Sequence, residues 1–201
     1  MNLFHSPTSP FVRKVMACAI ERDIDRQIEL VPTNAHASPP DLLANNPLSK
    51  VPCLVTGDGF ALFDSPVICE YLDSVGEALP MFPRPGSALR WQALKLQALG
   101  DGMLDAAVGR RMEQAKPRDA GREAWLARQK AAIDRSLDLL ETEVPHKTID
   151  IGTITIACAL GYLDFRFAAE PWRGAKPELA AWFEAFSDTP GILRTVPKDP
   201  A

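Results

Sequence analysis

The chain has few of the residues on which metal sites and disulfide frameworks depend. Its 201 residues include four cysteines and three histidines, and neither type is clustered. No two cysteines form a Cys-x-x-Cys pair and each lies among apolar neighbours, so we expect no metal site. A disulfide framework is not expected in a chain of this length without a secretion signal. We therefore interpret Cys18, Cys53, Cys69 and Cys158 as buried core thiols.

The sequence also lacks an excess of basic charge and any long apolar run. Lys and Arg total 22 against 26 Asp and Glu, which gives a formal net charge of −4, and the acids are spread along the chain. A basic face for nucleic acid is therefore not expected. No run of about 18 apolar residues occurs, so no membrane span is expected. No charged and apolar leader precedes the strand-like Leu3-Phe4, which predicts a cytoplasmic protein.

The N-terminal part alternates between strand-like and helix-like segments. Residues 2–5 predict a short strand, and a turn cluster rich in Ser and Pro follows it. Pro10 suits the first turn of a helix that has Ser9 as its N-cap and runs to about Arg22. Residues 26–31 alternate between polar and apolar and predict a second strand. A strand–helix–strand connection of this kind predicts that the two strands are parallel.

A hairpin and another helix complete this α/β unit. A short helix is predicted around residues 41–44. Strands are predicted at about 53–56 and 60–63, and the glycine-rich turn between them predicts an antiparallel hairpin. A helix from about Ser65 to Val75 follows.

The second half of the chain is predicted to be helical. The stretch from Gly76 to Gly86 contains three prolines and is the best linker in the chain. Apolar residues then recur at helical spacing, and one helix is apolar almost all round, which marks it as central and buried. The predicted helices cover residues 87–115, 119–144 and 154–169, with a last one that starts near Pro177.

This order of elements resembles the cytosolic glutathione S-transferases, and the resemblance covers essentially the whole chain. Three segments carry it: Ser9-Pro10-Phe11, the run from Asn46 to Pro52, and Asp64-Ser65. The likeness is closest to a bacterial subgroup that starts Thr-Ser-Pro-Phe-Val-Arg-Lys, here Thr8 to Lys14. The predicted fold class is α/β plus all-α. It consists of a thioredoxin-like domain at residues 1–76, a linker at 77–86 and an all-helical domain at 87–201.

The resemblance implies a site for glutathione, a tripeptide with two carboxylates, an amine and a thiol. Val51-Pro52 resembles the family's cis-proline, which would turn the Val51 amide and carbonyl outward to pair with the cysteinyl backbone. Asp64 would accept from the ligand's amine, and Ser65 at the helix start would take the γ-glutamyl carboxylate. The same residues also have structural explanations. Val51-Pro52 can be an ordinary trans proline that starts an edge strand, and Asp64-Ser65 can be a plain helix cap without a ligand.

Two side chains are candidates for the second carboxylate, that of the glycyl end. Lys50 matches the family position just before Val-Pro. His36 fits with one inserted residue, and its alternative is an exposed loop histidine. Phe11 belongs to the Ser-Pro-Phe segment and completes the set of predicted glutathione-binding residues.

Ser9 is the predicted activating hydroxyl. It occupies the position before Pro-Phe that a cysteine fills in omega-like and glutaredoxin-like members of the family. A serine cannot form a mixed disulfide, but it can donate a hydrogen bond to a thiolate, which the helix N-terminus also favours. Thr8 and Ser6 are rivals for this role. The structural alternative is that Ser9 only caps the helix.

The helical half should supply the pocket for the electrophile, and it departs from the family at one point. The pocket candidates are Met103, Ala107, Arg110 and Arg111, with Asp101 and Asp105 as acids that could approach the amine of a partner's ligand. The structural alternative is that Met103 is a core residue and that the two arginines form a solvated helix face. The buried helix commonly starts with a Ser/Thr-x-x-Asp capping box, but here Cys158 follows Thr155 in place of the acid. Thr155 or Thr153 can still cap the helix, but we expect the reciprocal bond of the box to be lost.

The function implied by the resemblance is addition of the glutathione thiolate to a small hydrophobic electrophile. Glutathione is the cosubstrate, and a homodimer is expected. Two alternatives remain. One is glutathione-dependent reduction of disulfides or peroxides, which the absence of a cysteine at position 9 weakens. The other is a non-catalytic glutathione-binding or regulatory protein on the same scaffold, because a fold does not fix a function.

Overall fold

The computed structural model describes residues 1–198, and the chain forms two compact units. The first unit contains Met1–Arg90 together with the segment that begins at Thr189, and the second contains Trp91–Asp188. The first is an α/β unit and the second is all-helical, so the predicted fold class is confirmed. Within the described residues, no helix combines the length and the hydropathy needed to cross a bilayer.

A four-stranded mixed sheet forms the centre of the first unit. Its strands are β1 (Asn2–His5), β2 (Glu29–Pro32), β3 (Cys53–Val55) and β4 (Ala61–Leu62), in the order β2-β1-β3-β4. β1 and β2 are parallel, and β3 is antiparallel to both β1 and β4. The predicted crossover and hairpin are therefore both present. β2 starts later than predicted because Asp25–Gln27 form a 3₁₀ turn, in which the Ile28 amide donates to the Asp25 carbonyl.

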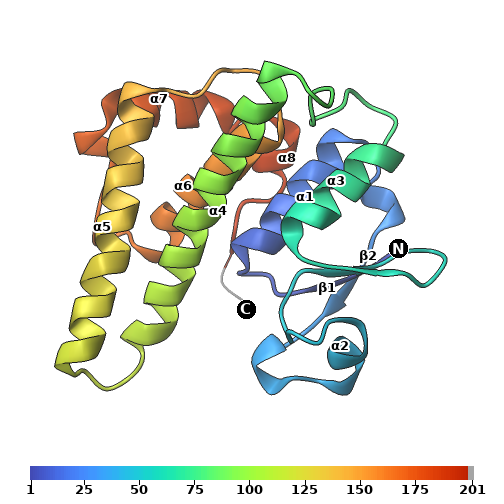
Figure 1. The fold of residues 1–201 in the computed structure, drawn as a ribbon, viewed down its shortest axis with the longest axis horizontal. Helices are drawn as coiled ribbons and strands as arrows, with labels where there is room; N and C mark the ends of the chain where they lie inside the picture. The colour runs from blue at the N-terminus through green and yellow to red at the C-terminus, as the bar shows by residue number, and fades with distance from the viewer. Residues whose placement is uncertain (199–201) are drawn as a thin grey trace. The chain divides into compact units, whose positions relative to one another are not determined.

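Three helices cover the sheet. α1 (Pro10–Glu21) and α3 (Ser65–Val75) lie side by side on one face, and α2 (Pro40–Asn45) lies on the other (Figure 1). Successive residues of a strand point to opposite faces, so Phe4 and Cys53, which are paired in the sheet, reach the α2 side together. There they pack against Leu42 of α2, which is fully buried. The predicted boundaries of α1 and α3 are correct to within one residue.

The C-terminal segment is fastened to α1, a feature that the linker-based division of the chain does not anticipate. Its short helix α8 (Pro190–Leu193) starts where the Gly191 amide donates to Glu21 at 2.6 Å. The Arg13 guanidinium donates to the Ile192 carbonyl at 3.3 Å. A Cβ on Gly191 would lie 2.7 Å from the Ala17 carbonyl oxygen, so only glycine allows this approach. The sequence places all residues after 86 in the helical domain, but these contacts group the segment with the first unit.

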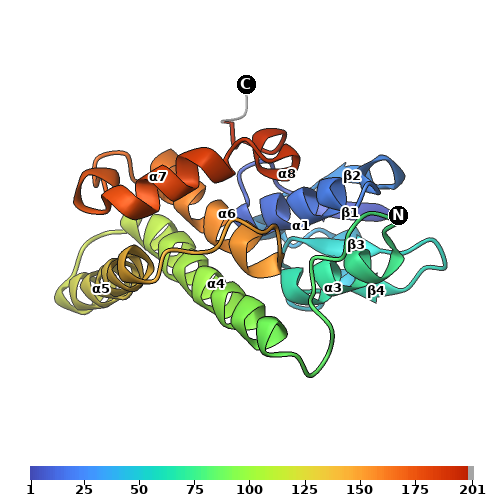
Figure 2. The same cartoon turned by 90° about the horizontal axis from the view of Figure 1, so that it is seen from above.

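The second unit is built from four helices. They are α4 (Ala88–Gln114, whose first three residues belong to the first unit), α5 (Ala120–Thr142), α6 (Ile151–Arg166) and α7 (Pro177–Phe186). A short turn joins α4 to α5, and a 3₁₀ turn at Arg173–Ala175 precedes α7 (Figure 2). Every residue of α6 from Ile151 to Leu163 is buried, as its sequence predicts.

The start of α6 differs from the prediction. The N-cap is Asp150, whose carboxylate accepts from the Thr153 amide at 2.9 Å, while the Thr153 hydroxyl accepts from the Asp150 amide at 2.9 Å. The reciprocal box is therefore present, with acid and hydroxyl exchanged, and the prediction that it is lost was wrong. The predicted helix start at 154 was three residues too late for the same reason. Thr155 lies inside the helix, where its hydroxyl donates to the Ile151 carbonyl, and Cys158 is a buried core residue.

Two glycines of α4 provide a matched test of helix packing. A Cβ on Gly100 would lie 2.8 Å from the Thr155 methyl carbon of α6, whereas a Cβ on Gly102 would meet nothing within 4 Å. We expect Gly100→Ala to lower the free energy of unfolding by about 1–3 kcal/mol, because the close approach of α4 and α6 would be overpacked. We expect Gly102→Ala to raise it by about 0.5–1 kcal/mol, because alanine favours the helix. Urea unfolding of both variants measures the difference, and equal effects would contradict the proposed packing.

Candidate functional site

Ser9 lies where β1 turns into α1. Its hydroxyl oxygen accepts from the Val12 amide at 3.3 Å, its carbonyl accepts from the Arg13 amide, and Pro10 fills the first helical position. The predicted N-cap is therefore present. Because the hydroxyl oxygen accepts in this capping bond, its own proton stays available for donation to another acceptor. Ser6, Thr8 and Phe11 are also half-buried in this turn and at its end.

The peptide bond between Val51 and Pro52 is cis, as the resemblance implies. Pro52 is buried and leads directly into β3, while Val51 packs against the cluster formed by Phe4, Leu42 and Cys53. Burial raises the pKa of the Cys53 thiol to about 11, so this neighbour of Pro52 is protonated at neutral pH. It is not a nucleophile there, because the reactive form of cysteine is the thiolate.

The start of α3 differs in detail from the prediction. The N-cap is Asp64, not Ser65, and the Asp64 side chain makes no capping hydrogen bond. Its carboxylate is exposed, whereas Ser65 is 1% exposed and occupies the first helical position. Pro66 has no amide proton, so the donors of this first turn are the amides of Ser65 and Val67. The Asp64 carboxylate is thus an acceptor, and the amides of Ser65 and Val67 are two donors within four residues of chain. None of these three groups takes part in a hydrogen bond that the helix itself requires.

His36 and Lys50 lie on two loops that hydrogen bonds hold together. Both side chains are exposed. Ser49, with a φ of +51°, donates to the Ala35 carbonyl at 3.0 Å, one residue before His36. Asn46 is 1% exposed, and its amide group donates to the Lys50 carbonyl at 2.9 Å. The carboxamide oxygen of Asn46 also accepts from the Leu48 amide at 3.0 Å. We did not assign Asn46 or Ser49 a role from the sequence, although an Asn-Pro-x-Ser turn is a recognisable signal.

The sheet register brings these segments to one end of the first unit. The last residue of β1 is paired with the last residue of β2, and the residue before it is paired with the first residue of β3. β4 runs antiparallel to β3, so its end, which leads to Asp64, lies at the same edge. The structure therefore gathers at this edge all the predicted glutathione-binding residues and the predicted catalytic serine: Ser9, Phe11, His36, Lys50, Val51, Pro52, Asp64 and Ser65.

The electrostatics of this end favour an anion. The N-termini of α1 and α3 both lie here, and each carries the positive end of a helix dipole and backbone amides without helical partners. Lys50 adds a full positive charge. Burial lowers the pKa of His5 at the end of β1, so that this imidazole is neutral at pH 7. The arrangement can hold carboxylates and a thiolate, and it has one carboxylate, Asp64, for an ammonium group.

The residues of the helical unit that were predicted to serve an electrophile pocket differ from one another in exposure and contacts. Met103 and Ala107 are buried. Arg111 is exposed, but Arg110 is not part of a solvated face: its guanidinium donates to both oxygens of Glu170, at 2.7 and 2.9 Å. Asp101 is half-buried and Asp105 is exposed. A role for these residues toward an electrophile stays a prediction.

Two family models match the chain. The model described as "Glutathione S-transferase, N-terminal domain" matches residues 8–75, and "Glutathione S-transferase, C-terminal domain" matches residues 123–185. The first match spans the segments that form the candidate site, from Ser9 to Ser65. The two matches together cover more than half of the chain.

Full-length relatives agree with these matches. The chain is 40% identical to the "Uncharacterized GST-like protein YibF" of Escherichia coli, over 98% of each sequence. It is 30% identical to "Glutathione S-transferase 3" of Zea mays, over 98% of this chain and 93% of that one. A glutathione transferase family member from Pseudomonas fluorescens, solved with bound glutathione, is 41% identical with a TM-score of 0.90, over 98% and 99% of the two chains. The chain therefore belongs to the glutathione S-transferase family.

Proposed function

We propose that the protein binds glutathione at the end of the sheet described above and adds its thiolate to small hydrophobic electrophiles. The observation that carries the proposal is the convergence of two helix N-termini, the Val51-Pro52 segment and Asp64 at one edge of the first unit. The family member from Pseudomonas fluorescens, solved with bound glutathione, supports this cosubstrate. The same protein is also solved with bound S-(propanoic acid)-glutathione, a thioether, at 42% identity to this chain and a TM-score of 0.85.

Each part of glutathione has a counterpart in the site. Asp64 accepts from the γ-glutamyl ammonium group, while the Ser65 hydroxyl and amide donate to the γ-glutamyl carboxylate. The Val51 backbone pairs with the cysteinyl residue as an added strand. Lys50 and His36 attract the glycyl carboxylate. Phe11 belongs to the same site through its place two residues after Ser9, in the first turn of α1.

The reaction requires a thiolate in place of a thiol. The Ser9 hydroxyl donates a hydrogen bond to the sulfur, and the dipole of α1 lowers the free energy of the negative charge. The sulfur lone pair then forms a carbon–sulfur bond to the electrophile. In a substitution, the electron pair of the broken bond leaves with the displaced anion, and the thiol proton goes to solvent. Ser9 keeps its own proton throughout.

Two measurements test the proposal. Isothermal calorimetry with glutathione reports binding, and the absorbance change with 1-chloro-2,4-dinitrobenzene reports conjugation. We expect saturable binding and glutathione-dependent turnover. Absence of binding would overturn the proposal. Binding without turnover on a panel of aryl halides and epoxides would favour the non-catalytic alternative, and glutathione-dependent cleavage of hydroxyethyl disulfide alone would favour the reductase.

Asn46 is a positioning residue whose effect can be isolated. Asn46→Ala removes the two hydrogen bonds that shape the loop before Lys50. We expect the Kd of glutathione to rise about tenfold, a loss of about 1.4 kcal/mol, because Lys50 and Val51 are no longer held in place. The neighbouring Asn45→Ala, which removes an exposed bond to the Asp41 carbonyl, is the matched control and should change Kd less than about twofold. Equal effects of the two substitutions on glutathione calorimetry would contradict a positioning role.

We also propose that the protein is a homodimer. The support is its family membership together with the large apolar side chains that this structure leaves exposed, among them Phe60, Val67, Leu89 and Trp91. Light scattering during size-exclusion chromatography measures the mass directly. A mass near that of one 22.0 kDa chain at all concentrations would contradict the proposal.

A further inference from the structure

The C-terminal segment of the first unit lies along α1, the helix that Ser9 caps. Residues 189–195, which we call the clasp, contain the short helix α8. Figures 1 and 2 both show α8 beside α1. None of the residues proposed to meet glutathione belongs to the clasp, so contacts with glutathione do not explain this arrangement.

Three contacts of the clasp fall on one row of α1. The Arg13 guanidinium donates to the Ile192 carbonyl at 3.3 Å, near the start of the helix. The Gly191 amide donates to Glu21 at 2.6 Å in the last turn, and a Cβ on Gly191 would lie 2.7 Å from the Ala17 carbonyl oxygen. Residues four apart lie on the same face of a helix, so positions 13, 17 and 21 form one line that the clasp covers.

Ser9 lies at the start of this line, one turn before Arg13. The Arg13 amide donates to the Ser9 carbonyl at 3.0 Å, and the Ser9 hydroxyl oxygen accepts from the Val12 amide at 3.3 Å. The main chain that places the Ser9 hydroxyl is therefore bonded directly to the residue whose side chain reaches the clasp.

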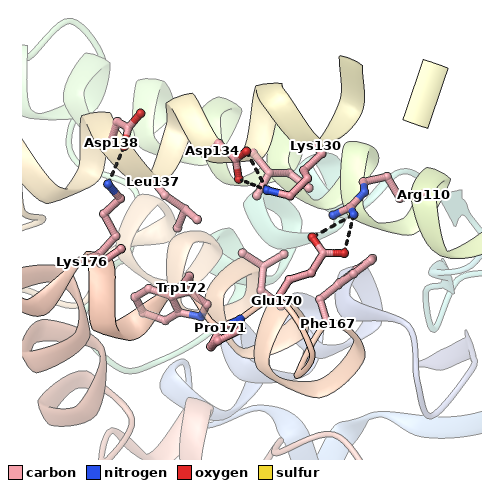
Figure 3. A pocket seen from close by; sticks show the side chains of 13 residues that line it. Arg110, Lys130, Asp134, Leu137, Asp138, Phe167, Glu170, Pro171, Trp172 and Lys176 are labelled. Atoms are coloured by element: carbon pink, nitrogen blue, oxygen red, sulfur yellow. Dashed lines mark hydrogen bonds and ion pairs between the residues drawn. The ribbon is translucent and has the colours of Figure 1, made fainter. Parts of the chain in front are cut away.

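Arg13 differs from the two other arginines that are buried in the described part of the chain. Arg22 faces the carboxylate of Asp73 at 3.2 Å, and Arg110 faces that of Glu170 at 2.7 Å (Figure 3). Arg22 and Arg110 are thus held by ion pairs. Arg13 is 8% exposed, and its hydrogen bonds go to neutral groups instead.

The acceptors of Arg13 both come from the clasp. Its Nη2 donates to the Ile192 carbonyl, and its Nε donates to the Thr195 hydroxyl at 3.4 Å. Its Nη1 is buried without a hydrogen-bond partner among residues 1–198. A buried charge without hydrogen bonds is costly, so the clasp supplies the groups that keep this guanidinium packed beside α1.

The far end of the clasp is also held. The Thr195 hydroxyl donates to the Gly191 carbonyl at 2.6 Å, which closes the turn of α8. Arg194 pairs with Asp25, in the 3₁₀ turn that follows α1. The clasp therefore contacts α1 in its first turn, in its last turn and just beyond its end.

We propose that the clasp positions Ser9, because it holds the first turn of α1 through Arg13 and thereby fixes the direction of the Ser9 hydroxyl. Arg13 is a positioning residue that acts through Ser9 and does not itself contact glutathione. A donor must be held within about 0.5 Å of its productive position, so a loosened first turn lowers the thiolate population more than it lowers glutathione affinity. This consequence for the thiolate rests on the proposed function, whereas the hold on α1 does not.

Two substitutions loosen the clasp from opposite sides. Arg13→Met keeps a long side chain and removes the donors. Gly191→Ala puts a Cβ 2.7 Å from the Ala17 carbonyl oxygen and 2.8 Å from the Glu21 carboxylate, so α8 has to move away from α1. Gly57→Ala is the matched control, because a Cβ at Gly57 meets nothing within 4 Å and Gly57 lies in the turn between β3 and β4.

Amide hydrogen exchange of the full chain without glutathione measures the hold on α1. We expect the amides of residues 12–17 to exchange at least about tenfold faster in Arg13→Met and in Gly191→Ala than in the native protein. The amides of β1 should keep their native rates in both variants, and Gly57→Ala should keep native rates throughout. Native rates at residues 12–17 in both variants would overturn the proposal, and so would equal acceleration in α1 and β1.

The ultraviolet absorbance of the thiolate of bound glutathione measures the consequence for Ser9. At about pH 6.5 we expect the ionised fraction to fall at least about threefold in both clasp variants and to stay native in Gly57→Ala. The defect should shrink as the pH rises above about 8.5, and the Kd should change less than about threefold. A native ionised fraction in both variants, or a defect that is equal at all pH values, would overturn the positioning role. If the native protein bound no glutathione, the proposed function would fail, and the exchange rates would still decide whether the clasp holds α1.

Discussion

Replacing Ser9 by glycine is expected to lower kcat/KM for conjugation about 100-fold at pH 6.5 while leaving the Kd of glutathione within about threefold. A thiol with its ordinary pKa of about 8.5 is ionised in only about one molecule in a hundred at pH 6.5. The hydrogen bond from Ser9 favours the thiolate and so lowers the pKa of the bound thiol. Without that donor, the thiolate population at pH 6.5 falls toward the ordinary value.

The pH dependence has a definite sign. Because the lost group lowers the thiol pKa, the defect of the variant is largest at pH values below about 8.5 and shrinks as the pH rises through it. Above that pH, bound glutathione ionises without help. Initial rates with 1-chloro-2,4-dinitrobenzene between pH 6 and pH 9 measure the effect. A constant defect at all pH values would contradict a role in ionisation.

Glycine separates the two roles of Ser9. Ser9 is the N-cap of α1, and alanine at an N-cap costs about 0.5–2 kcal/mol, whereas glycine costs only a few tenths. Urea unfolding of Ser9→Gly should therefore show nearly native stability. Ser6→Ala and Thr8→Ala are the comparison variants, because Ser6 and Thr8 are the alternative candidates for the activating hydroxyl. If one of them reproduces the pH-dependent loss and Ser9→Gly does not, the activating hydroxyl is that residue's.

The second large effect is expected at the start of α3. The double variant Asp64→Ala/Ser65→Ala removes the acceptor for the γ-glutamyl ammonium and the hydroxyl for its carboxylate. Hydrogen bonds to charged groups are worth about 1.5–3 kcal/mol each, so the Kd of glutathione should rise by about two to four orders of magnitude. Neither side chain caps the helix, and Asp64 is exposed, so the loss of binding should not follow from unfolding.

A ligand lacking the γ-glutamyl group provides the control. Cysteinylglycine keeps the thiol and the glycyl carboxylate but cannot contact Asp64 or Ser65 as proposed. Its affinity should change little between the native protein and the double variant. The difference between the two ligands then isolates the interaction, as in a double-mutant cycle. Equal losses for both ligands on calorimetry would mean that the variant disturbs the site in general.

Parts of the fold could be predicted because their signals are local. The Ser-Pro start of α1, the glycine turn between β3 and β4, and Pro177 at the start of α7 act within a few residues, and the structure contains all three. The start of α6 could not be placed. Asp150 and Thr153 form the capping box with the reverse order of residue types, so a search for hydroxyl followed by acid led to Thr155, one turn inside the helix.

The same distinction applies to the candidate site. N-caps and prolines before strands are visible in one dimension, so Ser9, Val51-Pro52 and Asp64-Ser65 could be recognised in the sequence, and the family resemblance then implied their roles toward glutathione. The positions of Asn46 and Ser49 gained meaning only in the structure, where they hold the loops of His36 and Lys50 through bonds to backbone atoms. Such bonds depend on which loops meet, and sequence spacing does not contain that information.

The sequence by itself determined the two-unit plan, because that plan follows from periodicity and local turn chemistry, and the family resemblance implied the residues expected to meet glutathione. Tertiary structure alone decided two further features. It joined the C-terminal segment to α1 through Arg13 and Glu21, and it paired Arg110 with Glu170 across 60 residues. In each case the partners are distant in sequence, so their interaction energy appears only after packing brings them within contact distance.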